Sequence, residues 1–159
     1  MYDADEKTAD AVMKAFREEY GKSDVFLADR YDGMEETLAI LHKRFSLAVA
    51  TYKREDHAAQ LLEKFRMAHF FDAICGSNAA ATMTKNQIVK KAMNLVGVTP
   101  AESLLIGDSA NDAESAAQLG IPFIGVTYGY GFKCEADVAK FPHIACVQKP
   151  LQLVDFIAY

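Results

Sequence analysis

The sequence predicts an α/β fold in which a parallel sheet is covered by helices on both faces. Two observations predict it. Short apolar runs of strand length alternate with amphipathic segments along most of the chain, and capping residues or glycines separate the two kinds of segment. Strands joined through helices pair in parallel. With 159 residues, of which 51% are hydrophobic, the chain has material for one domain with a buried core.

The first part of the chain predicts two helices around a short apolar run. Residues 5–20 carry apolar side chains at helical spacing, and Gly21 ends the pattern. Residues 25–28 form the apolar run, and a turn follows it. A second helix is expected over residues 34–43, with its apolar side chains on one face.

From residue 47 onwards strands and helices alternate. The capping-box pair of Thr84 and Gln87 marks one helix start, and Gly97 marks its end. The first strand of this part is an uninterrupted apolar run, which predicts burial on both faces. Strands are expected at 47–51, 73–76, 103–107, 122–127 and 144–147, and helices at 54–68, 85–96, 111–119, 134–140 and 150–158.

Composition argues against several classes of protein. The net charge of −5 gives no basic surplus for nucleic-acid binding. No apolar run approaches the roughly 18 residues of a membrane span, and the polar, acidic N-terminus does not look like a signal peptide. Cys75, Cys134 and Cys146 lack metal-ligand spacing, and we expect reduced thiols packed as small hydrophobes in a cytoplasmic protein.

Four polar residues fall where strands end and helices begin. Thr51 ends one predicted strand, Asp108 ends another, Asp112 lies one turn into the next helix, and Lys85 begins a helix. Ligands of open parallel sheets bind beyond the carboxyl ends of the strands. Two carboxylates suit Mg²⁺, and an ammonium with a hydroxyl suits phosphate oxygens. Each residue alone is more commonly a turn, a cap or a surface charge, so the hypothesis of a phosphate site rests on the set.

The motifs around these residues resemble those of the haloacid dehalogenase superfamily of phosphohydrolases. The segment 104–112, continued to residue 121, resembles the fourth motif of that family, and 47–53 resembles its second motif. Lys85 occupies the place of the third-motif lysine. The segment 125–131 is similar to the stretch that follows the fourth motif in phosphoglycolate phosphatases.

The resemblance also implies a fold and a division of the chain. The family core is a Rossmann-like parallel sheet with helices on both faces. The segment 31–38 resembles the re-entry from a helical cap, and the helix at 5–20 resembles the last cap helix. Residues 1–22 are therefore expected to be a residual cap helix, and residues 23–159 the family core without its first strand.

By this resemblance the function is Mg²⁺-dependent hydrolysis of a phosphate monoester through a phosphoaspartate, most like that of phosphoglycolate phosphatase. The partner is a small phosphorylated metabolite. Thr51 and Lys85 are the expected catalytic residues that bind the phosphoryl group. Asp108 is expected to bind Mg²⁺, and Asp112 is expected to be a second ligand or to orient one.

The family nucleophile is not identified in this sequence. It belongs to an Asp-x-Asp-Gly-Thr motif after a hydrophobic strand, and no such motif occurs here. Asp3 has the required spacing to Asp5, but a predicted helix follows, which favours a helix cap. Asp29 follows an apolar run, but its partner Asp32 is one position too far away, which favours a linker. The expectation is that the nucleophile strand and the first part of the cap are missing.

This expectation has a consequence for the sheet. In the family the nucleophile strand lies between the strand ending at Thr51 and the strand ending at Gly107. Unpaired central edges are costly. We therefore expect the gap to be closed in one of three ways: by residues 25–28, by direct pairing of the two flanking strands, or by a strand of a second chain. The third possibility predicts self-association through the incomplete sheet.

Other functions fit the sequence less well. A receiver domain places its acidic residues before its Thr and Lys, the reverse of the order here. A dinucleotide-binding fold requires the motif Gly-x-Gly-x-x-Gly. Gly129 and Gly131 match its first two glycines, but Cys134 stands at the position of the third. A non-catalytic remnant of the family, which folds and binds Mg²⁺ or phosphate, stays open as the alternative to an enzyme.

Overall fold

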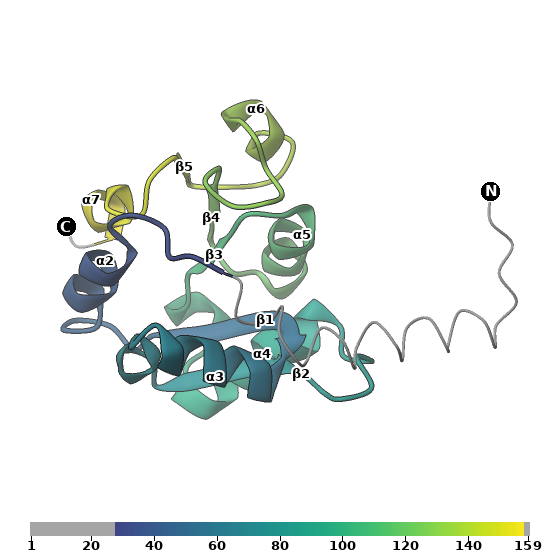
Figure 1. Ribbon diagram of the computed structural model, residues 1–159. Coiled ribbons are helices and arrows are strands. Elements are labelled where there is room, and N and C mark those ends of the chain that lie inside the picture. The colour runs from purple at the N-terminus through teal and green to yellow at the C-terminus, as the bar shows by residue number, and fades with distance from the viewer. Residues whose placement is uncertain (1–27, 158–159) are drawn as a thin grey trace, which may run out of the picture.

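The computed structural model describes residues 28–157 and confirms the α/β class, with parallel strands and interleaved helices (Figure 1). The expected cap helix at 5–20, the 1–22 segment, Asp3 and most of the 25–28 run lie outside the described residues. Between residues 28 and 157, no helix has the length and apolar character needed to cross a membrane.

Every helix and strand expected from residue 34 onwards is present. The helix at 85–96 has the expected ends, whereas the other elements begin or end at other residues. The helix expected at 54–68, for example, ends at Lys64, and a 3-10 turn follows. The elements are α2 (Met34–Leu41), β1 (Ala48–Arg54), α3 (Glu55–Lys64), η2 (Ala68–Phe70), β2 (Ala73–Ser77), α4 (Lys85–Val96), η3 (Pro100–Glu102), β3 (Leu105–Gly107), α5 (Ala110–Leu119), β4 (Phe123–Val126), α6 (Glu135–Val138), β5 (Ala145–Val147) and α7 (Gln152–Ile157).

The strands form two separate parallel sheets. One contains β1 and β2, and the other has the order β3-β4-β5. The expected direct pairing of the strands that end near Thr51 and Gly107 is wrong, because β1 and β3 belong to different sheets. Within residues 28–157, β1 pairs only with β2 and β3 only with β4, so each strand has one edge without a paired strand.

The expectation that the first of these strands is buried on both faces is also wrong. In β1, Ala48 and Tyr52 are exposed and the other residues are half-buried. The strand has a paired neighbour on one side only, which leaves part of its surface uncovered. It also continues past Thr51 to Arg54, with a shift of register between Ala50 and Arg54. Such irregularities are frequent at sheet edges and near active sites.

Helix α4 connects the two sheets through its apolar faces (Figure 1). Ile88 and Ala92 pack on Cys75 of β2, whereas Val89 belongs to a second core cluster with residues of α5 and β4. On the opposite face of β2, Gly76 lies against the start of α3. Helices therefore cover both faces of this sheet.

Strand β4 divides the second core in the same way. Phe123 packs in the cluster with α5 and α6, and Ile124 and Val126 pack toward Leu153 of α7. This alternation is the two-residue period of a strand buried on both faces. Gly125 leaves room for α6: an added Cβ would lie 2.3 Å from a methyl carbon of Val138.

The three cysteines occupy different environments. Cys75 is fully buried, Cys146 is partly buried, and burial raises the pKa of both thiols. Cys134 is exposed, so the expectation that it packs as a small hydrophobe is wrong. It stands at the start of α6, with its sulfur 3.6 Å from the Asp137 carboxylate.

The packing of Gly125 against α6 generates a prediction. Gly125→Ala is expected to lower the free energy of unfolding by about 1–3 kcal/mol, because the new methyl group overlaps Val138 in a fully buried site. Urea denaturation measures the change. Val138→Ala makes room for the added methyl group, so the double variant should lose less stability than the sum of the two single variants. Strict additivity would contradict this account.

Candidate active site

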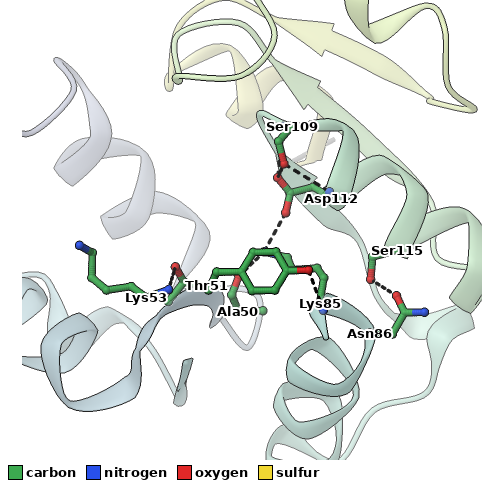
Figure 2. A network of polar contacts seen from close by, with 9 residues as sticks. Ala50, Thr51, Lys53, Lys85, Asn86, Ser109, Asp112 and Ser115 are labelled. Atoms are coloured by element: carbon green, nitrogen blue, oxygen red, sulfur yellow. Dashed lines mark hydrogen bonds and ion pairs between the residues drawn. The ribbon is translucent and has the colours of Figure 1, made fainter. Parts of the chain in front are cut away.

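The structure brings Lys85 and Asp112 into direct contact between the two sheets. Lys85 is the first residue of α4, and Asp112 lies in the first turn of α5. Thr51 lies next to them on β1, and its neighbour Ala50 is part of the same network (Figure 2). Asp108 follows β3 and is joined to this group through the chain at Ser109.

The Lys85 ammonium has two close oxygen partners. Its Nζ lies 2.7 Å from Oδ1 of Asp112 and donates to the carbonyl oxygen of Ala50 at 2.6 Å (Figure 2). The two charged side chains are only 12% and 10% exposed, so the pairing offsets the cost of removing both charges from water. An ammonium has three N–H donors. Two are used within residues 28–157, and one remains for a ligand oxygen.

Asp112 is held through its second oxygen by the start of its own helix. Oδ2 accepts hydrogen bonds from the Ser109 hydroxyl at 2.6 Å and from the Ser109 backbone N–H at 3.2 Å. The Ser109 hydroxyl in turn accepts from the Asp112 N–H, which completes a capping box. Gly107 permits this approach, because an added Cβ would lie 2.4 Å from Cβ of Asp112. Both oxygens of this carboxylate are therefore occupied by protein groups.

Thr51 lies within the irregular part of β1. Its hydroxyl oxygen accepts the Lys53 backbone N–H at 3.2 Å, and the side chain is half-buried. As far as residues 28–157 are concerned, this leaves the hydroxyl proton able to donate to a ligand. The hydroxyl and the ammonium thus supply two donors at the same edge of the sheet.

Asp108 is fixed by the loop that follows β4. Its Oδ2 accepts backbone N–H groups from Tyr130 at 2.6 Å and Gly131 at 3.0 Å. Its own carbonyl oxygen accepts the Phe132 N–H at 2.6 Å. An added Cβ at Gly129 would lie 2.3 Å from the Asp108 carboxylate, so this loop needs a glycine to approach it.

Two tyrosines connect this loop to the segment before α2. The rings of Tyr31 and Tyr128 meet edge to face, with centroids 5.1 Å apart. Burial, with smaller contributions from Tyr31 and Asp108, raises the pKa of Tyr128 to about 12. Tyr128 therefore stays neutral beside the carboxylate. Tyr128 packs against the core cluster that contains Ile124 and Leu153, whereas Tyr130 is 88% exposed.

Asp29 and Asp32 lie in the segment before α2, on either side of Tyr31. Both are exposed and line a hollow of about 690 Å³ at the start of α2, together with Arg30, Glu35 and Glu36. Arg30 is paired with Glu35 there. The surplus of carboxylates makes this hollow unfavourable for phosphate. Neither aspartate is among the hydrogen-bond or ion-pair partners that Lys85, Asp108 and Asp112 have within residues 28–157.

Three contacts of the site were not predicted from the sequence. The Ala50 carbonyl and the Tyr52 hydroxyl, which accepts the Lys85 backbone N–H at 3.1 Å, come from another strand and leave no local pattern. The hydrogen bond between Ser109 and Asp112 could have been predicted, because the two residues have the spacing of a capping box at a helix start.

The donor set fits a hard divalent cation with few protein ligands. Mg²⁺ keeps several waters and takes one or two carboxylates. In the described part of the chain, no group of three or more acidic, His or Cys side chains could enclose a metal. Oδ1 of Asp108 has no hydrogen-bond partner between residues 28 and 157, whereas both oxygens of Asp112 do have partners. Asp108 is the carboxylate of this group that fits a metal.

Comparisons with known proteins find similar sequences over most of this chain. The family model described as haloacid dehalogenase-like hydrolase matches residues 1–126. A phosphoglycolate phosphatase of Pseudomonas putida is 32% identical over 130 residues, 80% of this chain and 47% of that protein. A 5′-nucleotidase of Pseudomonas aeruginosa is 30% identical over 144 residues, 89% of this chain and 65% of that protein.

A solved structure shows the same fold. The structure described as a predicted phosphatase from Clostridium acetobutylicum has a TM-score of 0.86 and 33% sequence identity, and covers 99% of this chain and 73% of that chain. The chain spans about half the length of the phosphoglycolate phosphatases that it matches.

The ion pair at the centre of the site predicts a large effect on stability. Asp112→Asn leaves the Lys85 ammonium without its counter-charge at a site 12% exposed, and we expect a loss of about 2–3 kcal/mol in unfolding free energy. Urea denaturation measures it. Lys140→Met breaks an exposed pair with Asp137 and is the control, with little effect expected. Equal, small effects of both variants would contradict a structural role for the buried pair.

Proposed function

The chain belongs to the haloacid dehalogenase-like hydrolase family, and we propose that its site binds Mg²⁺ and the phosphoryl group of a small metabolite, which is the binding part of Mg²⁺-dependent hydrolysis of a phosphate monoester; no nucleophile for that reaction is assigned within residues 28–157. One observation carries this proposal. The Lys85 ammonium is held at the start of α4 by two oxygens, with a third donor left over beside Thr51. A fixed cation with a neighbouring hydroxyl, at the N-terminus of a helix of 12 residues, favours an anion such as phosphate.

Each of the four residues has one role in this proposal. Lys85 donates to a phosphate oxygen and offsets its charge, and Thr51 donates from its hydroxyl. Asp112 holds Lys85 in place, which differs from the two roles expected for it, a second Mg²⁺ ligand or a residue that orients a ligand. A fixed geometry matters because donors that need not reorganise stabilise charge better than mobile ones.

Asp108 is the proposed Mg²⁺ ligand, through the oxygen that the loop after β4 does not hold. When bound, Mg²⁺ offsets the charge of the phosphoryl oxygens. The backbone N–H groups of Tyr130 and Gly131 fix the Asp108 carboxylate, so that its second oxygen keeps one orientation. This arrangement resembles other metal sites, in which outer hydrogen bonds orient the ligands.

For the substrate we propose a small phosphorylated acid of the phosphoglycolate type. The support is the identity to phosphoglycolate phosphatases, over 47% to 51% of their length. A relative named 5′-nucleotidase matches a larger part of the chain, so a nucleoside monophosphate is the competing substrate.

The alternative is a non-catalytic member of the family that binds Mg²⁺ or phosphate. The observation behind it is that the site, as described by residues 28–157, contains groups that bind charge but no carboxylate assigned to attack phosphorus. Asp29, one of the two low-ranked candidates for the nucleophile, is exposed beside α2, and Asp3 lies outside the described residues. Loss of a covalent nucleophile commonly costs several orders of magnitude in rate.

Phosphate binding tests the proposed site without requiring turnover. In the presence of Mg²⁺, the chain is expected to bind inorganic phosphate, measured by calorimetry. Lys85→Met and Asp108→Asn are each expected to weaken binding at least about tenfold, because each removes one of the proposed charge contacts. The control Lys140→Met should bind like the wild type. Wild-type affinity in both site variants would sink the proposal.

Turnover separates an enzyme from a binding protein. We expect the chain to release phosphate from p-nitrophenyl phosphate no faster than its Asp108→Asn variant. Rapid Mg²⁺-dependent release that disappears in Asp29→Asn would identify Asp29 as the nucleophile, and loss in Asp3→Asn would identify Asp3. Either result would contradict the expectation that the nucleophile is missing and would exclude the non-catalytic alternative.

A further inference from the structure

The exposed residue Tyr52 contacts both the backbone N–H and the side-chain ammonium of Lys85. The Tyr52 hydroxyl accepts the Lys85 backbone N–H at 3.1 Å, and the ring centroid lies 5.8 Å from the Lys85 ammonium. We infer that Tyr52 is a positioning residue, which holds the Lys85 ammonium at the phosphate site and forms one wall of that site. The inference rests on the proposed function only for the identity of the ligand.

An irregularity of β1 is what lets Tyr52 reach the helix. Ala50 is paired with Cys75, whereas Arg54 is paired with Ser77, so residues 51–53 on β1 face only Gly76 on β2. Extra residues in one strand bend it and re-aim its side chains. Thr51 and Tyr52 would point to opposite faces of a regular strand. In this irregular segment the Tyr52 hydroxyl reaches the start of α4.

The hydroxyl of Tyr52 satisfies a group that the helix itself cannot. The first N–H groups of a helix have no partner inside it. The Thr84 side chain accepts from Gln87, and Tyr52 accepts from Lys85. The first residue of α4 is therefore fixed from β1, the same strand whose Ala50 carbonyl holds the ammonium.

The ring of Tyr52 lies on one side of the ammonium, with its centroid 5.8 Å from Nζ. The Lys85 side chain is 12% exposed and Tyr52 is 49% exposed, so Lys85 is the more buried partner of this contact. An aromatic face within about 6 Å attracts a cation. Tyr52 is thus an exposed residue and not part of the core, and its contacts with Lys85 hold it beside the proposed phosphate site.

Phosphate binding to Tyr52 variants tests the inference. Tyr52→Phe keeps the ring and loses the hydroxyl, and we expect inorganic phosphate to bind about two- to threefold more weakly in the presence of Mg²⁺. Tyr52→Leu loses both contacts and should bind at least about tenfold more weakly. Phe156→Leu, at another exposed aromatic residue, is the control and should match the wild type. Circular dichroism checks that each variant is folded.

A spectroscopic signal tests the contact independently of phosphate. The ring current of Tyr52 should displace the NMR signals of the Lys85 side-chain methylene next to Nζ, which Lys85→Met identifies by their loss. The displacement should remain in Tyr52→Phe and vanish in Tyr52→Leu. The contact between Tyr52 and Lys85 is overturned if the Lys85 signals are unchanged in Tyr52→Leu.

The two tests separate this inference from the proposed function. If wild-type protein binds no phosphate but the Lys85 signals move in Tyr52→Leu, the phosphate site fails and the Tyr52–Lys85 contact stands. If wild-type protein binds phosphate and Tyr52→Leu binds it equally well, the positioning role fails and the phosphate site stands.

Discussion

The arrangement of the site depends on the largely buried ammonium group of Lys85. The two sheets share no strand pairing within residues 28–157, and they are connected there by α4 and the side chains around it. Lys85 joins the Ala50 carbonyl of β1 to the Asp112 carboxylate of α5 in a single bridge. A charge so little exposed is tolerable because two oxygens accept hydrogen bonds from it and one of them carries the opposite charge. The position of Lys85 therefore fixes the relation between β1 and α5 where the ligand is proposed to bind.

The two carboxylates of the site are held by hydrogen bonds and an ion pair, while one oxygen of Asp108 stays without a partner within residues 28–157. Asp112 uses one oxygen for the cation and the other for the start of its helix, and Asp108 uses one oxygen for two backbone N–H groups. Glycines stand where these carboxylates approach the chain most closely, at Gly107 and Gly129. Such positions tolerate no side chain, so the carboxylates and the turns around them form one unit.

Local signals in the sequence predicted local structure well. The limits of α4 follow from the capping box at Thr84 and from the left-handed Gly97, both of which act within one turn. The contact of Lys85 with Asp112 agrees with their expected places at the starts of two helices that follow parallel strands. What failed was non-local. The burial of β1 depends on which strands lie beside it, and its continuation past Thr51 depends on pairing with β2. The hydrogen bonds from the Tyr130 and Gly131 N–H groups to Asp108 join residues more than twenty positions apart. Their donors are backbone atoms, which leave no pattern in the sequence.

The capping box of Ser109 and Asp112 has a consequence for motion. Because one carboxylate both starts α5 and neutralises Lys85, fraying of the first turn of that helix removes the counter-charge of the cation. Opening of the helix end is therefore linked to the electrostatics of the site. An anion that replaces part of this charge balance changes how often the turn opens. The rate of amide hydrogen exchange at the start of α5 therefore reports ligand binding at Lys85, even if the ligand does not contact α5.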